Sequence, residues 1–330
     1  MRATVVGSGA WGTALAIRLH KNGHDVTMWT FEKDLIEEME TTRRNPRLPG
    51  AVLPEGLKIS GDYACVRGSE LVVIASPSFP MRSVCRSVAP HLDADAVVVT
   101  VTKGIEEGTC KRMSQIAAEE TGKQVVVLTG PSHAEEVSLD IPTGLLAACE
   151  DPRLAGFVQD AFMSENLRIY TSTDPVGAEL GAALKNVMAL CAGVCDGLGH
   201  GDNTKALLMT RGLTELARLG VAMGASRDTF TGLSGVGDLI VTCTSMHSRN
   251  RRAGILIGQG KGVREAMQEV GAVVEGYYAA KSAWALGRKM GVEMPITEAA
   301  YKVLYEGADA AAVTRELLLR SKKAEDAGWL

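Results

Sequence analysis

Residues 2–12 read RATVVGSGAWG, an apolar run that leads into three glycines spaced as Gly-x-Gly-x-x-Gly. The β-branched residues before the glycines predict a buried strand, and residues 10–23 have the pattern of a helix that stops at Asn22-Gly23. A second apolar run over 25–29 predicts the next strand. A glycine-rich turn inside such a strand–helix–strand unit is typical of dinucleotide binding.

Each glycine of this turn has its own expected role. Gly7 permits the tight turn, Gly9 lets the backbone approach a pyrophosphate, and Gly12 allows close packing of the helix on the strand. The N-terminus of the helix supplies unpaired N–H groups and positive potential for phosphates. The alternative is a purely structural glycine turn, and the flanking strands and helix argue against it.

The rest of the chain falls into two halves of different character. Further apolar runs predict strands at 71–76, 96–102, 124–130, 143–149 and 167–173. Continuous Val, Ile and Leu runs separated by helices indicate a parallel sheet covered on both faces. After Asp174-Pro175 helical patterns dominate, at 175–195, 203–223, 276–290 and 296–306. We expect a doubly wound α/β domain over residues 1–173 and an all-α domain over 174–330.

Composition limits the classes of function. With 330 residues and a hydrophobic fraction of 46%, the chain can build two cores, and its net charge of −4 carries no nucleic-acid signature. The seven cysteines form no CxxC pair, which favours a reduced compartment and predicts no metal site. No secretory signal pattern and no charge-free run of about 18 apolar residues is present in the sequence. We expect a cytoplasmic protein without membrane insertion.

The end of the second predicted strand bears on cofactor choice. Glu32 stands 20 residues after Gly12, near the spacing of the acidic residue that binds the ribose 2′-hydroxyl. A carboxylate there accepts a hydrogen bond from NAD and repels the 2′-phosphate of NADP. Lys33 follows it and no arginine lies beside it, so we predict NAD over NADP. Phe31 either covers the adenine ring or is an ordinary core residue.

One lysine lies inside a nearly uniform run of small apolar residues, GAELGAALKNVMALCAGV (177–194). A buried ammonium group is costly without a partner. On a helix, Lys185 shares its face with Gly181 and Met188, and small residues on that face let another segment approach closely. The alternative is a side chain that reaches out to water. We favour a functional lysine, followed by Asn186.

Two strand ends carry further candidates. Lys103 directly follows the run 96–102, in the sequence VTKG, at the edge where ligands of open α/β sheets bind. The alternative is a lysine at a strand end that only contacts water. Gly130 and Ser132, in TGPSHAEE (129–136), offer backbone N–H groups and a hydroxyl, and Ser132 with Glu135 also fits a helix cap.

The stretch GVGDLIVT (235–242) precedes the basic segment SRNRR (248–252). Asp238 and Thr242 fall on one face if this stretch is helical. The basic segment is a nucleic-acid patch, a solvated face or a phosphate site. We expect one functional arginine, Arg249, and two solvated ones, because an arginine fork beside Ser and Asn suits phosphate.

Together these segments resemble the NAD(P)-dependent sn-glycerol-3-phosphate dehydrogenases along nearly the whole chain. The matching stretches are GSGAWGTA, VTKG, TGPSHAEE, GAALKNV, DGLGHGDNTKAL, GVGDLIVTCTSMHSRNRR, VVEGY and MPIT. A Lys-Asn pair in a small-residue helix, followed by GxGDL and SRNRR, is highly specific. The stretch TMWTFE (27–32) looks like the eukaryotic cytosolic NAD enzymes, whereas the length and SRNRR look like the bacterial branch.

The resemblance implies a Rossmann-type domain, a helical substrate domain and a homodimer. It implies reversible reduction of dihydroxyacetone phosphate to sn-glycerol 3-phosphate with NAD or NADP, for phospholipid synthesis. It makes Lys185 the general acid and base. To this catalytic group we add Lys103, which brings positive charge to the same oxygen, and Asp238 with Thr242, which orient the lysine. The substrate residues that it implies are Lys103, Gly130, Ser132, Asp238, Ser248, Arg249 and Asn250, to which we add Lys185 and Asn186. Those that it implies on the cofactor are Ala10, Trp11, Phe31, Phe79, Lys103, Ala134, Arg249, Val273 and Glu275, beside Gly7, Gly9, Gly12 and Glu32 from the glycine turn and the second strand.

Three points stay open at this stage. The nearest alternative is a dehydrogenase of hydroxy acids or phosphogluconate with a similar helical domain. A nicotinamide-binding redox sensor without catalysis is another, although it needs neither a buried lysine nor a phosphate-binding arginine. The stretch 196–212 borders either the active site or a dimer interface.

Overall fold

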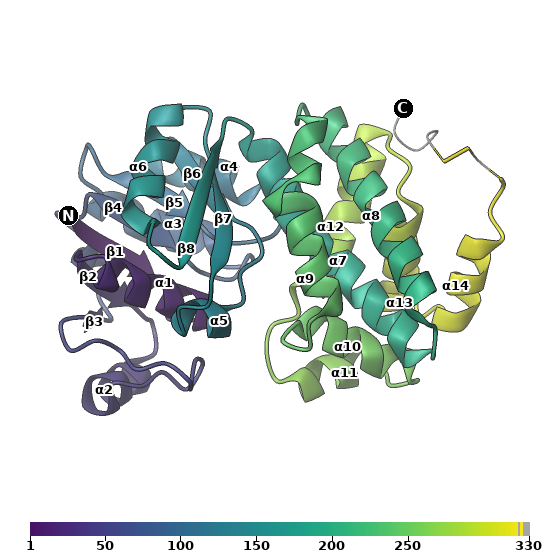
Figure 1. The fold of residues 1–330 in the computed structure, drawn as a ribbon, viewed down its shortest axis with the longest axis horizontal. Helices are drawn as coiled ribbons and strands as arrows, with labels where there is room; N and C mark the ends of the chain where they lie inside the picture. The colour runs from purple at the N-terminus through teal and green to yellow at the C-terminus, as the bar shows by residue number, and fades with distance from the viewer. Residues whose placement is uncertain (323, 326–330) are drawn as a thin grey trace. The chain divides into compact units, whose positions relative to one another are not determined.

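The computed structural model describes residues 1–322, 324 and 325, and it divides into two compact units (Figure 1). The first unit comprises Met1–Thr102 and Met113–Pro175. The second comprises Lys103–Arg112 and the described chain from Val176 onward. Expectation from sequence assigned all of residues 1–173 to the first domain. In the structure the short segment that begins at Lys103 packs with the helices, because its Ile105 is buried in the helical core.

The first unit is built on an eight-stranded sheet with the order β3-β2-β1-β4-β5-β6-β7-β8. The strands are β1 Arg2–Val6, β2 Asp25–Trp29, β3 Lys58–Ser60, β4 Leu71–Ile74, β5 Val97–Thr100, β6 Val125–Thr129, β7 Thr143–Ala148 and β8 Leu167–Ser172. The expected α/β class is confirmed, with β3 as a three-residue edge strand that the apolar pattern did not reveal.

The sheet departs from the expected parallel order at one pair, because β7 runs antiparallel to β6 while β8 is parallel to β7. The two strands are joined by residues 130–142, which contain one helix of five residues, α5 (Ala134–Ser138). A connection of this length is long enough for a parallel crossover, which needs about a dozen residues and usually a full α-helix. The direction of β7 is therefore set by the tertiary structure and is not encoded in the strand pattern.

Helices cover both faces of this sheet (Figure 1). They are α1 Ala10–Lys21, α2 Lys33–Thr42, α3 Met81–Val88, α4 Met113–Thr121, α5 and α6 Pro152–Phe162. Successive strand residues point to opposite faces. Val5 therefore packs in the core under α1 and α6, whereas Val6 packs in the core under α3 and α4. This two-sided burial explains the unbroken apolar runs.

The second unit is helical in its described part. Its helices are α7 Pro175–Gly197, α8 Asp202–Ala222, α9 Asp238–Thr244, α10 Arg249–Gly258, α11 Val263–Val270, α12 Glu275–Met290, α13 Pro295–Tyr305 and α14 Ala310–Leu318. By length and composition α7 could cross a membrane, but 94% of its most apolar stretch is buried inside the protein. It is the core helix of this unit (Figure 1).

The small residues of α7 let other segments touch its backbone. A Cβ at Gly181 would lie 2.3 Å from the carbonyl oxygen of Ser234, in the π-helical turn Leu233–Gly237 that precedes α9. Farther along, a Cβ at Gly193 would lie 2.0 Å from the carbonyl oxygen of Arg251 in α10. The close approach expected beside Lys185 is confirmed, and it delivers α9 and α10 to the face of α7.

Candidate functional site

Four residues of the second unit form a buried charged cluster around Asp238. The side chain of Asp238 is 1% exposed, and Lys185, from α7, forms an ion pair with its Oδ1. Lys103 Nζ lies 3.0 Å from the other carboxylate oxygen, Oδ2. Thr242, one turn after Asp238 in α9, accepts a hydrogen bond of 2.8 Å from Lys185 Nζ. All four residues predicted as the catalytic group therefore meet, and Lys185 does not reach out to water.

The charges of this cluster do not cancel. Lys103 and Lys185 share one carboxylate, so the cluster carries one excess positive charge while both lysines are protonated. Burial lowers the pKa of Lys185, and the nearby Lys103 ammonium lowers it further, while Asp238 opposes both effects. Loss of one proton from Lys185 would leave a neutral Lys103–Asp238 pair. The cluster is thus suited to give and take a proton next to a developing oxyanion.

Two asparagines predicted to bind substrate, Asn186 and Asn250, also form hydrogen bonds within the protein. Asn250 Nδ2 donates to Asn186 Oδ1 at 3.0 Å, and Asn250 Oδ1 accepts from the backbone N–H of Gly276 at 2.8 Å. Both asparagines are at least 92% buried. They join α7, α10 and the first turn of α12, where the predicted cofactor residue Glu275 also lies.

The basic segment 248–252 is only partly as expected. Ser248 is 5% exposed and caps α10 by accepting a 3.2 Å hydrogen bond from the N–H of Arg251. Arg249 is exposed. The expectation that Arg251 is solvated is wrong, because its side chain is 14% exposed and pairs with Asp196 at 2.8 Å. Arg252 is also half-buried.

The Asp196–Arg251 pair gives the stretch 196–212 a structural role. Lys205, in the first turn of α8, binds the other oxygen of Asp196 at 2.7 Å. Arg251 also donates to the carbonyl oxygen of Thr244, the last residue of α9, at 2.7 Å. Asp196 therefore ties α7 and α8 to the junction of α9 and α10. The sequence did not reveal this network, because Asp196 and Arg251 are 55 residues apart and no local pattern brings them together.

The dinucleotide turn of the first unit has the geometry that its glycines predict. Gly7 has φ 130°, and a Cβ there would lie 2.5 Å from the carbonyl oxygen of Ala75. A Cβ at Gly12 would lie 2.1 Å from the carbonyl oxygen of Gly7. A Cβ at Gly9 would meet no described atom of the protein within 4 Å, so protein packing does not account for this glycine. Gly9 is also the N-cap of α1 and supplies no side-chain hydrogen bond to it. An open backbone at an uncapped helix N-terminus fits a pyrophosphate.

Residues around this turn fit the rest of a dinucleotide. Ala10 and Trp11 open α1, and the half-buried Trp11 packs on the core below. Of the two alternatives for Phe31, the ordinary core residue is wrong, because its side chain is 72% exposed after β2. Phe79 is 69% exposed after β4, and β2 and β4 flank β1 in the sheet. Two exposed rings thus border the glycine turn, where rings of a cofactor could stack.

The remaining predicted residues lie at the ends of their elements. Gly130 follows β6 with φ 135°, and the Ser132 hydroxyl donates to the Gly130 carbonyl at 2.9 Å. Ser132 does not cap α5, because the N-cap position is His133 and Ala134 is the first helical residue. Val273 borders a hollow of about 260 Å³ just before α12.

Glu32, predicted to bind the ribose, is the N-cap residue of α2 and is paired with an arginine that sequence reasoning missed. Arg47 Nη2 lies 2.7 and 2.6 Å from the two carboxylate oxygens of Glu32. No arginine is a sequence neighbour of Glu32, yet the loop after α2 brings one to it. Only the backbone path of that loop reveals the pair.

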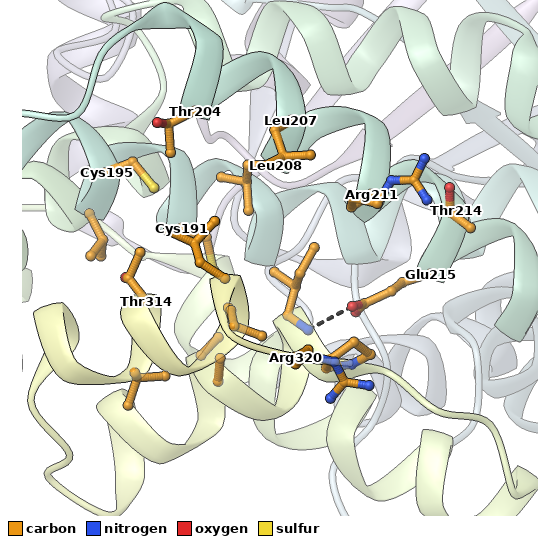
Figure 2. Close-up of a pocket in the computed structure, with 18 of the residues that line it drawn as sticks. Cys191, Cys195, Thr204, Leu207, Leu208, Arg211, Thr214, Glu215, Thr314 and Arg320 are labelled. Atoms are coloured by element: carbon orange, nitrogen blue, oxygen red, sulfur yellow. Dashed lines mark hydrogen bonds between the residues drawn. The ribbon is translucent and has the colours of Figure 1, made fainter. Parts of the chain in front are cut away.

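A separate cavity of about 380 Å³ lies among α7, α8, α13 and α14 (Figure 2). Glu215 borders it, and its carboxylate accepts the backbone N–H groups of Ile296 and Thr297 at the start of α13, at 2.6 and 3.2 Å. Burial raises the pKa of Glu215 to about 7. None of the four catalytic candidates borders this cavity. In the described chain, no group of three His, Cys, Asp or Glu residues could hold a metal ion.

Two family models together match nearly the whole chain. The N-terminal model of NAD-dependent glycerol-3-phosphate dehydrogenase covers residues 2–155, and its C-terminal model covers residues 174–315. The chain belongs to the NAD-dependent glycerol-3-phosphate dehydrogenase family. It is therefore an oxidoreductase, as the resemblance implied.

Curated relatives and solved structures agree with the family models. A glycerol-3-phosphate dehydrogenase (NAD(P)⁺) from Fusobacterium nucleatum is 50% identical and covers 100% of both chains. The crystal structure of glycerol-3-phosphate dehydrogenase from Coxiella burnetii matches with TM-score 0.93 at 37% identity, over 97% of this chain and 99% of that chain. The enzyme of Saccharomyces cerevisiae matches with TM-score 0.83 at 27% identity, over 96% and 98%.

Proposed function

We propose that this member of the glycerol-3-phosphate dehydrogenase family interconverts dihydroxyacetone phosphate and sn-glycerol 3-phosphate with NAD(H) or NADP(H). The observation that carries the proposal is the buried Lys103–Asp238–Lys185 cluster with its excess positive charge. A reduced carbonyl oxygen needs positive charge and a proton at the same place, and the cluster holds both. Relatives at 50% identity over the full length carry this activity in their name.

The residues of the first unit fit the cofactor at its diphosphate and at its rings. The open backbone at Gly9 and the uncapped start of α1 are suited to the pyrophosphate. The exposed rings of Phe31 and Phe79 border the turn on its two sides. When bound, NADH or NADPH supplies the hydride that reaches C2 of the ketone.

Lys185 acts as the general acid in reduction and as the general base in oxidation. As negative charge grows on the C2 oxygen, the Lys185 ammonium donates its proton there, and Lys103 adds positive charge. In the reverse direction Lys185 must be neutral to accept the hydroxyl proton. Its pKa, lowered by burial, makes that neutral form accessible near physiological pH. Asp238 and Thr242 fix the direction of the ammonium group.

We assign the substrate phosphate to Arg249, at the N-terminus of α10. Its side chain is exposed, and an arginine fork matches phosphate oxygens. Ser248 and Asn250 hold the start of α10 and its contact with α7, and they remain substrate candidates. Gly130 and Ser132 remain substrate candidates through their backbone N–H groups.

We also propose that the enzyme works as a cytoplasmic homodimer in phospholipid precursor synthesis. The seven cysteines, all described, are free thiols, as expected of a reducing compartment. Sedimentation at micromolar concentration tests the dimer, and a single species with the mass of one chain would contradict it.

The decisive test is NADH oxidation with a panel of carbonyl substrates. We expect activity with dihydroxyacetone phosphate and none with keto acids or phosphogluconate. Lys185→Met should lower kcat by about 10²–10⁴-fold while the Kd of NADH stays unchanged, because only proton transfer is lost. Lys289→Met, at an exposed lysine of α12, is the matched control and should keep full kcat. A kcat of Lys185→Met within a few-fold of the wild type would reject the assignment.

A further inference from the structure

We propose that Arg47 binds the 2′-phosphate of NADP(H), so that the Glu32–Arg47 pair lets one site accept both nicotinamide dinucleotides. In this view Glu32 accepts a hydrogen bond from the ribose 2′-hydroxyl of NAD(H). When a 2′-phosphate takes the place of that hydroxyl, Arg47 binds the phosphate instead. The inference rests on the proposed use of a dinucleotide by the first unit. It changes the expectation from sequence, which favoured NAD because no arginine adjoins Glu32.

The pair lies where the ribose of a dinucleotide is expected. Glu32 follows β2 at the carboxyl edge of the sheet, next to the glycine turn that follows β1. In this fold class the acidic residue at that place binds the ribose 2′-hydroxyl, and a nearby arginine accommodates a 2′-phosphate. Arg47 Nη1 also lies 3.5 Å from Ser8 Oγ, inside the glycine turn. One arginine thus reaches both the carboxylate and the turn.

A buried asparagine holds the loop of Arg47 against the glycine turn. Asn45 is 1% exposed, and its Nδ2 donates to the carbonyl oxygen of Ser8 at 2.8 Å and to Thr13 Oγ1 at 2.7 Å. Its Oδ1 accepts the backbone N–H of Arg47 at 3.0 Å. A buried amide with every one of these bonds made is a positional anchor. The arginine is therefore presented by a built loop at a set distance from the turn.

The far side of this loop is anchored as well. Arg43, which ends α2 in the left-handed conformation at φ 51°, donates from its guanidinium to the carbonyl oxygens of Leu53 and Leu57. Leu48, the residue after Arg47, is 1% exposed in the core under α1. Fixed points on both sides of Arg47 leave its side chain as the part that can exchange partners.

The Glu32–Arg47 contact is suited to exchange. The side chains are 34% and 41% exposed, and an ion pair at that exposure contributes little net stability because water competes for both charges. A doubly charged phosphate offers the guanidinium a stronger, bidentate partner than one carboxylate. With NAD(H) bound, Arg47 keeps the carboxylate oriented toward the 2′-hydroxyl. With NADP(H) bound, it turns to the phosphate and shields it from Glu32.

Calorimetric titration of the full chain with NADH and NADPH, without substrate, tests the proposal. Arg47→Ala should raise the Kd of NADPH at least about tenfold and that of NADH less than about threefold, since a charge-assisted bidentate contact is lost only with the phosphate. Glu32→Gln should tighten NADPH and weaken NADH. Arg44→Ala, an exposed arginine on the same loop, removes the same charge and should shift both Kd values less than about twofold.

Two results would overturn the proposal. One is a wild-type chain that binds NADH but not NADPH, and the other is an equal loss of both cofactors in Arg47→Ala. Turnover of dihydroxyacetone phosphate is not measured in these titrations. A chain that binds both cofactors as expected but lacks that turnover would reject the proposed function and leave this inference standing. A chain that binds neither cofactor would reject both.

Discussion

Asp238→Asn should move the pH profile of the enzyme in a direction that follows from the charges of the cluster. The variant removes the charge of Asp238, which favours the ammonium form of Lys185, while burial and the charge of Lys103 remain. Both remaining effects lower the pKa of Lys185. Asparagine keeps the shape of the side chain, and Thr242 still accepts its hydrogen bond from Lys185, so the lysine stays near its place.

The size of the shift follows from the contact geometry. An opposite charge in contact with a titratable group changes its pKa by about 1–3 units, equivalent to about 1.4–4 kcal/mol. Asp238 touches Lys185 directly and Lys103 at 3.0 Å, in a place where its side chain is 1% exposed. We expect the pKa of Lys185 to fall by about 1–3 units in the variant.

The sign differs between the two directions of the reaction. Oxidation of glycerol 3-phosphate needs neutral Lys185, so its activity appears above the pKa, and the acid limb of kcat should move to lower pH. Reduction needs the ammonium form, so the basic limb should move to lower pH too, and kcat at neutral pH should fall. Profiles of kcat from pH 5 to 10 in both directions measure this, with Asp228→Asn, an exposed carboxylate of the same unit, as control. Equal losses at every pH, with unmoved limbs, would refute the reasoning.

Three further variants probe the surroundings. Arg249→Ala should raise KM for dihydroxyacetone phosphate at least about tenfold with kcat within about threefold, as expected for a lost phosphate contact; an unchanged KM in steady-state assays would place the phosphate elsewhere. Asp196→Asn should raise the same KM several-fold, because Arg251 and Lys205 lose their shared acceptor, whereas an unaltered KM would make that network irrelevant to the site. The wild type should lose roughly 3–4 kcal/mol of its free energy of unfolding as the pH rises from about 4.3 to 7, because the Glu215 carboxyl ionises near pH 4.3 in the unfolded chain but only near 7 in the folded chain. Glu215→Gln should not show this loss, because glutamine does not ionise. Urea unfolding of both proteins at pH 5 and pH 8 shows whether the wild type alone loses stability.

Local patterns carried most of the architecture. The strand runs, the glycine turn and the helices are properties of a few neighbouring residues, so β1, α1 and α7 lie within two residues of their expected bounds. The direction of β7 could not be predicted, because strand propensity is the same for parallel and antiparallel strands and the connection from β6 is long enough for either.

The candidate site divides in the same way. Lys185 stood out because an ammonium group in an apolar helix is costly without a partner. The small residues beside it predicted that another segment packs closely against this face of the helix. Ser248 and Asn250 stood out in the sequence as ligand candidates, and only the fold shows that the first also caps a helix and the second also links two helices. The residue type alone does not reveal such hydrogen bonds within the protein.

By itself, the sequence determined the fold class, the glycine turn for a dinucleotide and the lysine that must be buried with a partner. Those features depend on periodicity and on the cost of burying charge, which act along the chain. The tertiary structure alone decided that Asp238 carries two lysines, that Asp196 holds Arg251, and that Arg47 meets Glu32. These contacts join side chains 15 to 135 residues apart, and they depend on backbone paths that no local pattern encodes.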